Sequence, residues 1–128
     1  MSFQFSILAA SIVLGGSTVP ASAASRESYI LWKAYIDCLG TKALALEPSG
    51  ASPDDLIKAA MTSCSARWAD AFDKLEAEYS ADPENGPSTA GPRALKMLNE
   101  GAEPKKDEVR LQILELRARR IENSAPNQ

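Results

Sequence analysis

The sequence predicts an all-α protein, with an antiparallel helical hairpin clasped by one disulfide and one or two C-terminal helices packed across it. Two segments carry apolar residues at helical spacing, and each holds one cysteine and one tryptophan. A stretch rich in proline, glycine and serine separates these segments. The last third of the chain returns to helical spacing, which predicts the additional helices.

Residues 1–23 have the features of an export signal. The apolar run ILAASIVLGG is well short of the roughly 18 to 20 residues that a membrane-spanning helix requires. The small residues Ala21 and Ala23 form an A-x-A site, which predicts cleavage between Ala23 and Ala24. No Lys or Arg precedes the run, so an uncleaved membrane anchor is the alternative. We expect a periplasmic or secreted protein, with no membrane contact after cleavage.

The mature chain, residues 24–128, has room for one modest domain. It carries all 14 basic and 17 acidic residues, and its net charge of -3 argues against nucleic acid as a partner. A chain of this length buries a small share of its surface, so a covalent link between segments would add needed stability.

Residues 24–81 are predicted to form the hairpin. Its first helix begins after Ser25, a good N-cap residue, and ends at Pro48 and Gly50. Ser52 caps the second helix, which we expect to be continuous for about six turns. Its apolar stripe consists of Ile57, Ala60, Met61, Cys64, Trp68, Ala71, Phe72, Leu75 and Tyr79.

The two cysteines lie at matching heights in such a hairpin. Cys38 is 12 residues before Gly50 and Cys64 is 14 after it, an offset of about 3 Å at 1.5 Å per residue. In an oxidising compartment these cysteines should form a disulfide, worth about 3.5 kcal/mol in the chain-entropy model. Trp32 and Trp68 are each 18 residues from Gly50, which predicts a core aromatic pair near the disulfide, with an exposed ligand platform as the alternative.

Other roles for the cysteines fit the sequence less well. A thioredoxin-like site places its cysteines two residues apart on a strand-to-helix turn, whereas 25 residues separate these two. A structural zinc site needs four Cys or His ligands, and the chain has no histidine. Free buried thiols are the remaining alternative, and we predict no metal site.

Three segments are expected after the hairpin. Residues 82–92 are rich in proline and glycine and predict a mobile loop. Residues 93–122 predict the C-terminal helices, a short one that stops at Gly101 and a last one that follows Pro104. Residues 123–128 predict a disordered tail.

The last helix carries two apolar stripes on roughly opposite sides. One consists of Leu111, Leu114, Ala118 and Ile121, and the other of Val109, Ile113 and Leu116. One stripe can pack on the hairpin, and the other is then covered by the short helix, exposed or pressed against a partner. We take Val109, Ile113 and Leu116 as the candidate interface, for self-association or for an unknown protein partner.

A basic cluster ends this helix. Arg117, Arg119 and Arg120 suit the negative end of the helix dipole, which favours a solvated face. The alternative is an anion patch.

The residues point away from catalysis. The chain has no histidine to serve as a base near neutral pH, and it lacks G-x-S-x-G, P-loop and dinucleotide-binding motifs, so no catalytic residue and no cofactor is predicted. We expect a non-enzymatic binding, accessory or inhibitor role. The alternative is a small histidine-free helical enzyme with a pocket between the hairpin and the last helix. The leucine and arginine pattern of residues 109–120, VRLQILELRARR, resembles that of small secreted chorismate mutases. Those helical enzymes use buried arginines, a lysine and an amide.

Overall fold

A computed structural model describes residues 21–84 and 86–125, with side chains from residue 26 onward. The described chain contains no strand, which confirms the all-α class. The predicted signal peptide lies outside the described residues except for Ala21–Ala23, whose backbone starts the first helix. The elements are α1 (Ala21–Leu46), the 3-10 helix η1 (Glu47–Ser49), α2 (Pro53–Ser63), α3 (Ser65–Ser80) and α4 (Gly86–Ser124).

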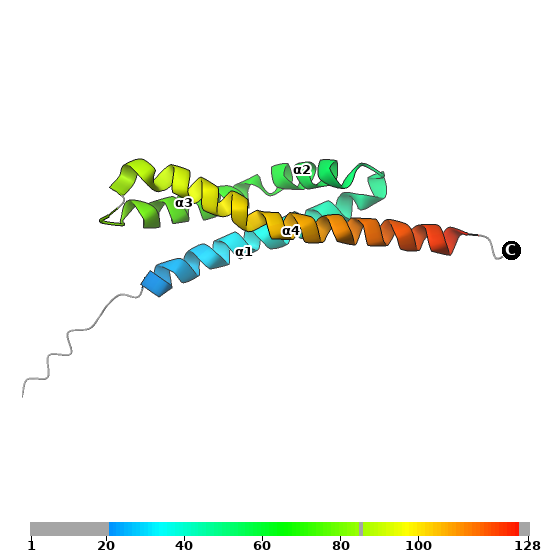
Figure 1. Cartoon of the computed structure of the whole chain (residues 1–128), viewed down its shortest axis with the longest axis horizontal. Helices are drawn as coiled ribbons and strands as arrows, with labels where there is room; N and C mark the ends of the chain where they lie inside the picture. The colour runs from blue at the N-terminus through cyan, green and yellow to red at the C-terminus, as the bar shows by residue number, and fades with distance from the viewer. Residues whose placement is uncertain (1–20, 85, 126–128) are drawn as a thin grey trace, which may run out of the picture.

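The predicted hairpin is present and turns where expected (Figure 1). Gly50 adopts the left-handed conformation with φ 77°, and its N–H donates to the carbonyl of Glu47 over 3.1 Å. Glycine suits this conformation because it has no Cβ. Ser52 caps α2 by accepting a hydrogen bond from the N–H of Asp55 over 3.2 Å, and Pro53 occupies the first turn. The residues that predicted the turn therefore make the contacts that form it.

The Cys38–Cys64 disulfide is also present. It joins α1 to the junction between α2 and α3, with the two Cα atoms 6.0 Å apart. This separation is ordinary for a disulfide. The disulfide fixes the height of α1 relative to the returning arm of the hairpin.

The returning arm is two helices rather than the single helix that was expected. At Cys64 the backbone leaves the helical conformation, with φ -99° and ψ 11°. The hydroxyls of Thr62 and Ser63 donate to carbonyls four residues earlier, over 3.2 and 3.1 Å, and such bonds bend helices. The backbone N–H and carbonyl of Cys64 still make helical hydrogen bonds, so α3 continues the path of α2.

One helix, α4, replaces the segments predicted after the hairpin. The expected loop at 82–92 is shorter than predicted, since residues 82–84 lie outside the helices but α4 begins at Gly86. The stop at Gly101 and the break before the last helix were wrong, because α4 runs through Pro92 and Pro104. A mid-helix proline costs about 3 kcal/mol. Each large apolar side chain that is buried returns about 1.5 to 3 kcal/mol, so packing offsets this cost. The buried residues of α4 are Ala90, Ala94, Leu98, Ala102, Val109 and Ile113.

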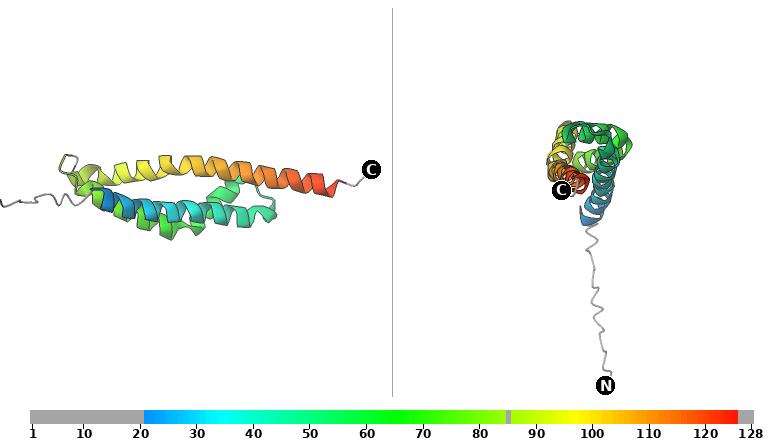
Figure 2. Two further views of the ribbon diagram at one scale, coloured as in Figure 1. Left: turned by 90° about the horizontal axis from the view of Figure 1, so that it is seen from below. Right: turned by 90° about the vertical axis from the view of Figure 1, so that its right-hand side faces the viewer.

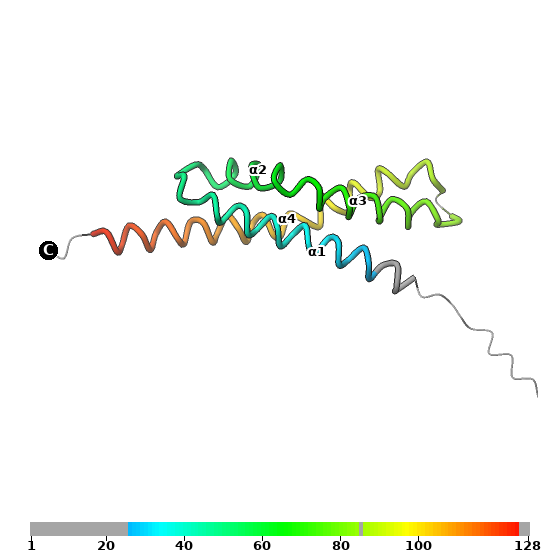
Figure 3. The backbone as a smooth tube through the Cα atoms, turned by 180° about the vertical axis from the view of Figure 1, so that it is seen from behind, coloured from blue at the N-terminus to red at the C-terminus, as the bar shows by residue number. Residues whose placement is uncertain are grey.

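α4 lies along the hairpin for most of its length (Figure 2). Its two halves run in different directions in Figure 1, as expected of a helix that contains proline. Its last turns extend past the turn between α1 and α2, whereas at the other end α1 moves away from α3 (Figure 3). The two ends of the molecule therefore differ in which helix extends beyond its neighbours, α4 at one end and α1 at the other.

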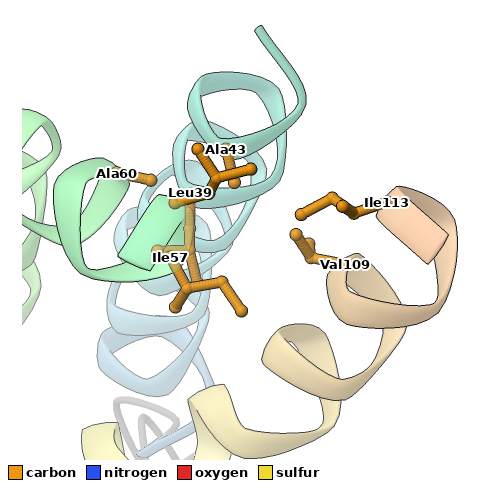
Figure 4. Packing of buried hydrophobic residues seen from close by; sticks show 7 residues of the cluster. Leu39, Ala43, Ile57, Ala60, Val109 and Ile113 are labelled. Atoms are coloured by element: carbon orange, nitrogen blue, oxygen red, sulfur yellow. The ribbon is translucent and has the colours of Figure 1, made fainter. Parts of the chain in front are cut away.

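The core consists of two clusters along the hairpin. The larger joins α1, α2 and α4 near the η1 turn, and Figure 4 shows its side chains converging. It contains Leu39, Ala43, Leu56, Ile57, Ala60, Val109 and Ile113. The smaller surrounds the disulfide and contains Tyr35, Ile36, Cys64 and Ala102.

Gly40 lies between these clusters at the contact of α1 with α4. A Cβ atom at this position would lie 3.0 Å from Cε of Lys105 and 3.8 Å from Val109. The glycine that weakens α1 by about 1 kcal/mol relative to alanine therefore permits close helix packing.

Removing the disulfide tests how much of this small fold depends on it. We expect Cys38→Ser combined with Cys64→Ser to lower the free energy of unfolding by about 3 kcal/mol, because the unfolded chain regains the entropy of an open loop. Urea denaturation followed by circular dichroism measures the change, and reduction of the unaltered protein is the matched control. Equal stability of the oxidised protein and the double variant would contradict the expectation.

Candidate functional site

A cavity of about 360 Å³ lies between α1, α3 and α4, toward the end of the molecule where α1 moves away from α3. This volume is at the lower end of the range for small-molecule sites. Most of its wall is apolar. Its lining residues are Ser28, Tyr29, Trp32, Ala71, Leu75, Glu78, Tyr79, Met97, Leu98 and Gly101.

α1 supplies the aromatic part of the wall. Tyr29 and Trp32 are three residues apart on one helix face, and their ring centroids lie 6.0 Å apart. Tyr29 is 57% exposed, whereas Trp32 is half-buried against the smaller core cluster. The aromatic wall therefore extends from the protein surface at Tyr29 to the core at Trp32.

Gly101 lets α4 approach the Trp32 ring closely. A Cβ atom on Gly101 would lie 3.3 Å from Nε1 of Trp32 and 3.4 to 3.5 Å from two of its ring carbons. The residue predicted to end a helix is inside α4 and forms part of the cavity wall instead.

The cavity has one carboxylate in its wall. The hydroxyl of Ser28, which is buried, donates to Oε1 of Glu78 over 2.5 Å. Next to this pair, Lys74 bonds Glu27 over 2.6 Å. The hydrogen bond from Lys74 lowers the pKa of Glu27, and the same bond raises the pKa of Lys74. These four side chains carry a net charge of -1, and the Lys74 ammonium interacts electrostatically with Glu78 as well as with Glu27.

Arg93 covers part of the wall from outside the cavity. Its guanidinium carbon lies 4.2 Å from the centroid of the Tyr79 ring, a cation–π distance. The same side chain approaches Oδ2 of Asp82 at 3.5 Å. The Arg93 charge therefore interacts with the Tyr79 ring and the Asp82 carboxylate.

The two tryptophans expected as a core pair contact different rings. Both pack against the smaller core cluster, near the disulfide, and both are half-buried. Trp68 stacks on Phe72 with centroids 5.1 Å apart, whereas Trp32 contacts Tyr29. Only Trp32 lines the cavity, so the two residues that mirror each other in the sequence have different surroundings.

The basic cluster of the last helix lies near the η1 turn and binds a carboxylate of the chain itself. Arg117 and Arg120 both reach Glu47, with Arg120 Nη2 2.6 Å from Oε2 and Arg117 Nε 3.2 Å from Oε1. Glu47 is only 2% exposed. Arg119 instead lies 3.9 Å from Glu115 at the surface. Of the residues considered for a solvated face or, alternatively, an anion patch, Arg117 and Arg120 are therefore paired with Glu47 of the same chain.

This group of Glu47, Arg117 and Arg120, which we call the Glu47 clamp, ties α4 to the end of the hairpin. Arg117 also donates to the carbonyl of Ala51, beyond the η1 turn. The hydrogen bond from Arg120 is the main cause that lowers the pKa of Glu47, and burial opposes it. The ionised carboxylate is therefore the form that the folded protein favours.

The candidate interface on the last helix is also corrected. Val109 and Ile113 are fully buried in the larger core cluster, so they are unavailable to a partner, and only Leu116 is exposed. The other stripe faces solvent, with Leu111 at 61%, Leu114 at 53% and Ile121 at 71% exposed. Both stripes carry apolar residues at helical spacing, so the sequence alone does not determine which stripe faces the hairpin.

A pocket between the hairpin and the last helix was expected only in the alternative of a small helical enzyme, and its lining residues were not predicted from the sequence. Leu75 and Tyr79 were expected in the core stripe of the hairpin, and the alternative of an exposed platform at Trp32 came closest. Ser28 and Glu78 are 50 residues apart, and their pairing depends on the hairpin register. No local motif marks such a pair.

No metal centre accompanies the cavity. In residues 21–84 and 86–125, no group of three or more Cys, Asp or Glu side chains is placed to hold a metal ion.

Comparison of the chain with protein-family models, curated proteins and solved structures gave no match. Its function is therefore inferred from the chemistry of the cavity.

Acid should weaken the Glu47 clamp. Because the pKa of folded Glu47 lies below its ordinary value of 4.5, the clamp stabilises the protein fully above that value and is lost as pH falls through the lowered pKa. We expect Glu47→Gln to reduce stability at pH 7, and the difference from the unaltered protein to shrink as the pH falls below 4.5 and through the lowered pKa of Glu47. Urea denaturation at pH 7, 5, 4 and 3 measures this.

Glu115→Gln is the matched control, because it removes an exposed carboxylate that pairs with Arg119 of the same basic cluster on α4. It should change stability little at any of these pH values. A stability difference for Glu47→Gln that stays constant from pH 7 to pH 3 would contradict the assignment.

Proposed function

We propose that this chain is a small exported protein with a non-enzymatic role, the binding of an apolar ligand in the cavity between α1, α3 and α4. The observation that carries this proposal is the cavity itself, whose wall is mostly apolar and aromatic with few polar groups. Small-molecule binding sites commonly have this composition, in which apolar contacts give affinity and a few polar groups orient the ligand.

The chemistry of the wall favours binding over catalysis. Arginine and lysine, which stabilise developing negative charge in many active sites, are absent from the lining side chains. The chorismate-mutase-like alternative needs cations in the pocket. In this chain Arg117 and Arg120 are bound to Glu47, in the region of the η1 turn.

Two observations support the location outside the cytoplasm. Residues 1–23 have a signal-peptide pattern, and Cys38 and Cys64 form a disulfide, a bond typical of oxidising compartments. Among the helices of the described residues, none combines the length and apolar character needed to cross a bilayer.

An uncharged apolar dye tests the binding proposal. We expect N-phenyl-1-naphthylamine to bind one site per chain, with a dissociation constant of roughly 200 µM or tighter at about 0.3 kcal/mol per non-hydrogen atom. Dye fluorescence, which rises in apolar surroundings, measures the binding. Leu75→Trp should weaken it at least tenfold, because the larger ring fills the cavity.

Leu95→Trp is the control for that variant, since it makes the same change at an exposed position of α4 outside the cavity wall. It should bind the dye as the unaltered protein does. Equal binding by both variants, or the absence of dye binding to the unaltered protein, would refute the proposed function.

The intact mass of the protein tests export. We expect the mature chain to begin at Ala24 and to gain two alkyl labels only after reduction, because the two cysteines are joined. Mass spectrometry of the protein from the cell envelope or medium measures both properties. A retained N-terminal segment, or labelling without reduction, would contradict export with cleavage.

A further inference from the structure

The charge of the cavity wall selects among apolar ligands. Glu78 is the one ionisable acid among the lining residues, and among described residues its hydrogen-bond donor is the hydroxyl of Ser28. That bond engages a single carboxylate oxygen, Oε1. Oε2 of Glu78 is left to accept a hydrogen bond from a ligand, because a carboxylate has several acceptor positions.

The cations nearest the cavity are already engaged. Lys74 is bound to Glu27 over 2.6 Å, and Arg93 lies against the Tyr79 ring and Asp82. Neither Lys74 nor Arg93 belongs to the lining residues. An anionic head group in the cavity would therefore meet the Glu78 carboxylate, whereas no lysine or arginine side chain lines the cavity to balance it.

The aromatic wall has the same preference. Tyr29 and Trp32 line the cavity, and the faces of aromatic rings attract cations, most strongly those of tryptophan. Tyr79 also lines the cavity, but its ring already contacts the Arg93 guanidinium. Amines and quaternary ammonium groups are recognised by such combinations of rings and carboxylates. The rest of the wall, from Leu75, Met97 and Leu98, can contact a hydrocarbon body.

We propose that the ligand of this cavity is an organic cation, an amine or quaternary ammonium head group attached to an apolar body. This inference rests on the proposed function and specifies its ligand class. The head group lies against Glu78 and the rings of Tyr29 and Trp32, and the body extends along Leu75 and Leu98.

Three ligands with the same octyl chain separate charge from apolar contact. Displacement of N-phenyl-1-naphthylamine from the unaltered, oxidised protein at pH 7.5 measures octyltrimethylammonium, 1-octanol and octanoate. We expect octyltrimethylammonium to bind at least tenfold more tightly than 1-octanol, and octanoate to bind most weakly. The comparison on the unaltered protein does not depend on whether any variant folds.

Two variants assign the preference to the carboxylate. Glu78→Gln keeps the shape of the side chain and an acceptor for Ser28 but removes the charge, so we expect the tenfold preference to disappear while 1-octanol still binds. Glu100→Gln, which removes an exposed carboxylate of α4 outside the cavity wall, should keep the preference.

The outcomes separate this inference from the proposed function. Equal binding of the three ligands, tighter binding of octanoate, or a preference that survives in Glu78→Gln overturns the cation assignment while the apolar site stands. Failure of the dye and of all three ligands to bind overturns the proposed function and the ligand class together.

Discussion

The Cys38–Cys64 disulfide is the constraint on which the rest of the structure depends. It holds α1 and the returning arm in one register, and the junction between α2 and α3 lies at the same residue. The paired side chains of the cavity and of the core depend on that register, since Ser28 and Glu78 meet only when the arms are aligned. In a small domain with a thin core, this one covalent bond fixes a helix register that many noncovalent contacts fix in a larger protein.

α4 completes the fold by packing along both arms of the hairpin. Its buried residues in the first half are mostly alanines, Ala90, Ala94 and Ala102 with Leu98 among them, and in the second half they are Val109 and Ile113. Small side chains allow helices to approach closely, and larger ones fill the space near the η1 turn. The helix persists through Pro92 and Pro104, each of which has buried residues of α4 on both sides of it.

The ends of the hairpin differ in chemistry. At the η1 turn the Glu47 clamp closes the structure with a buried carboxylate that is satisfied by two arginines. At the other end α1 moves away from α3, and the space is lined by rings and apolar side chains with the single carboxylate of Glu78. The Glu47 clamp at the η1 turn stabilises the fold, and the cavity toward the other end has the composition of a binding site.

The sequence by itself determined the all-α class, the turn at Gly50, the Ser52 cap and the disulfide, because these follow from local chemistry and from counting residues about a known turn. Proline and glycine also gave misleading signals at Pro92, Gly101 and Pro104, since local propensity was outweighed by long-range packing. Only the tertiary structure decided that Val109 and Ile113 face the hairpin while Leu111 and Leu114 face solvent, because both stripes are equally apolar. It also decided the partners of Glu47 and Glu78, which lie 50 or more residues away and leave no local pattern.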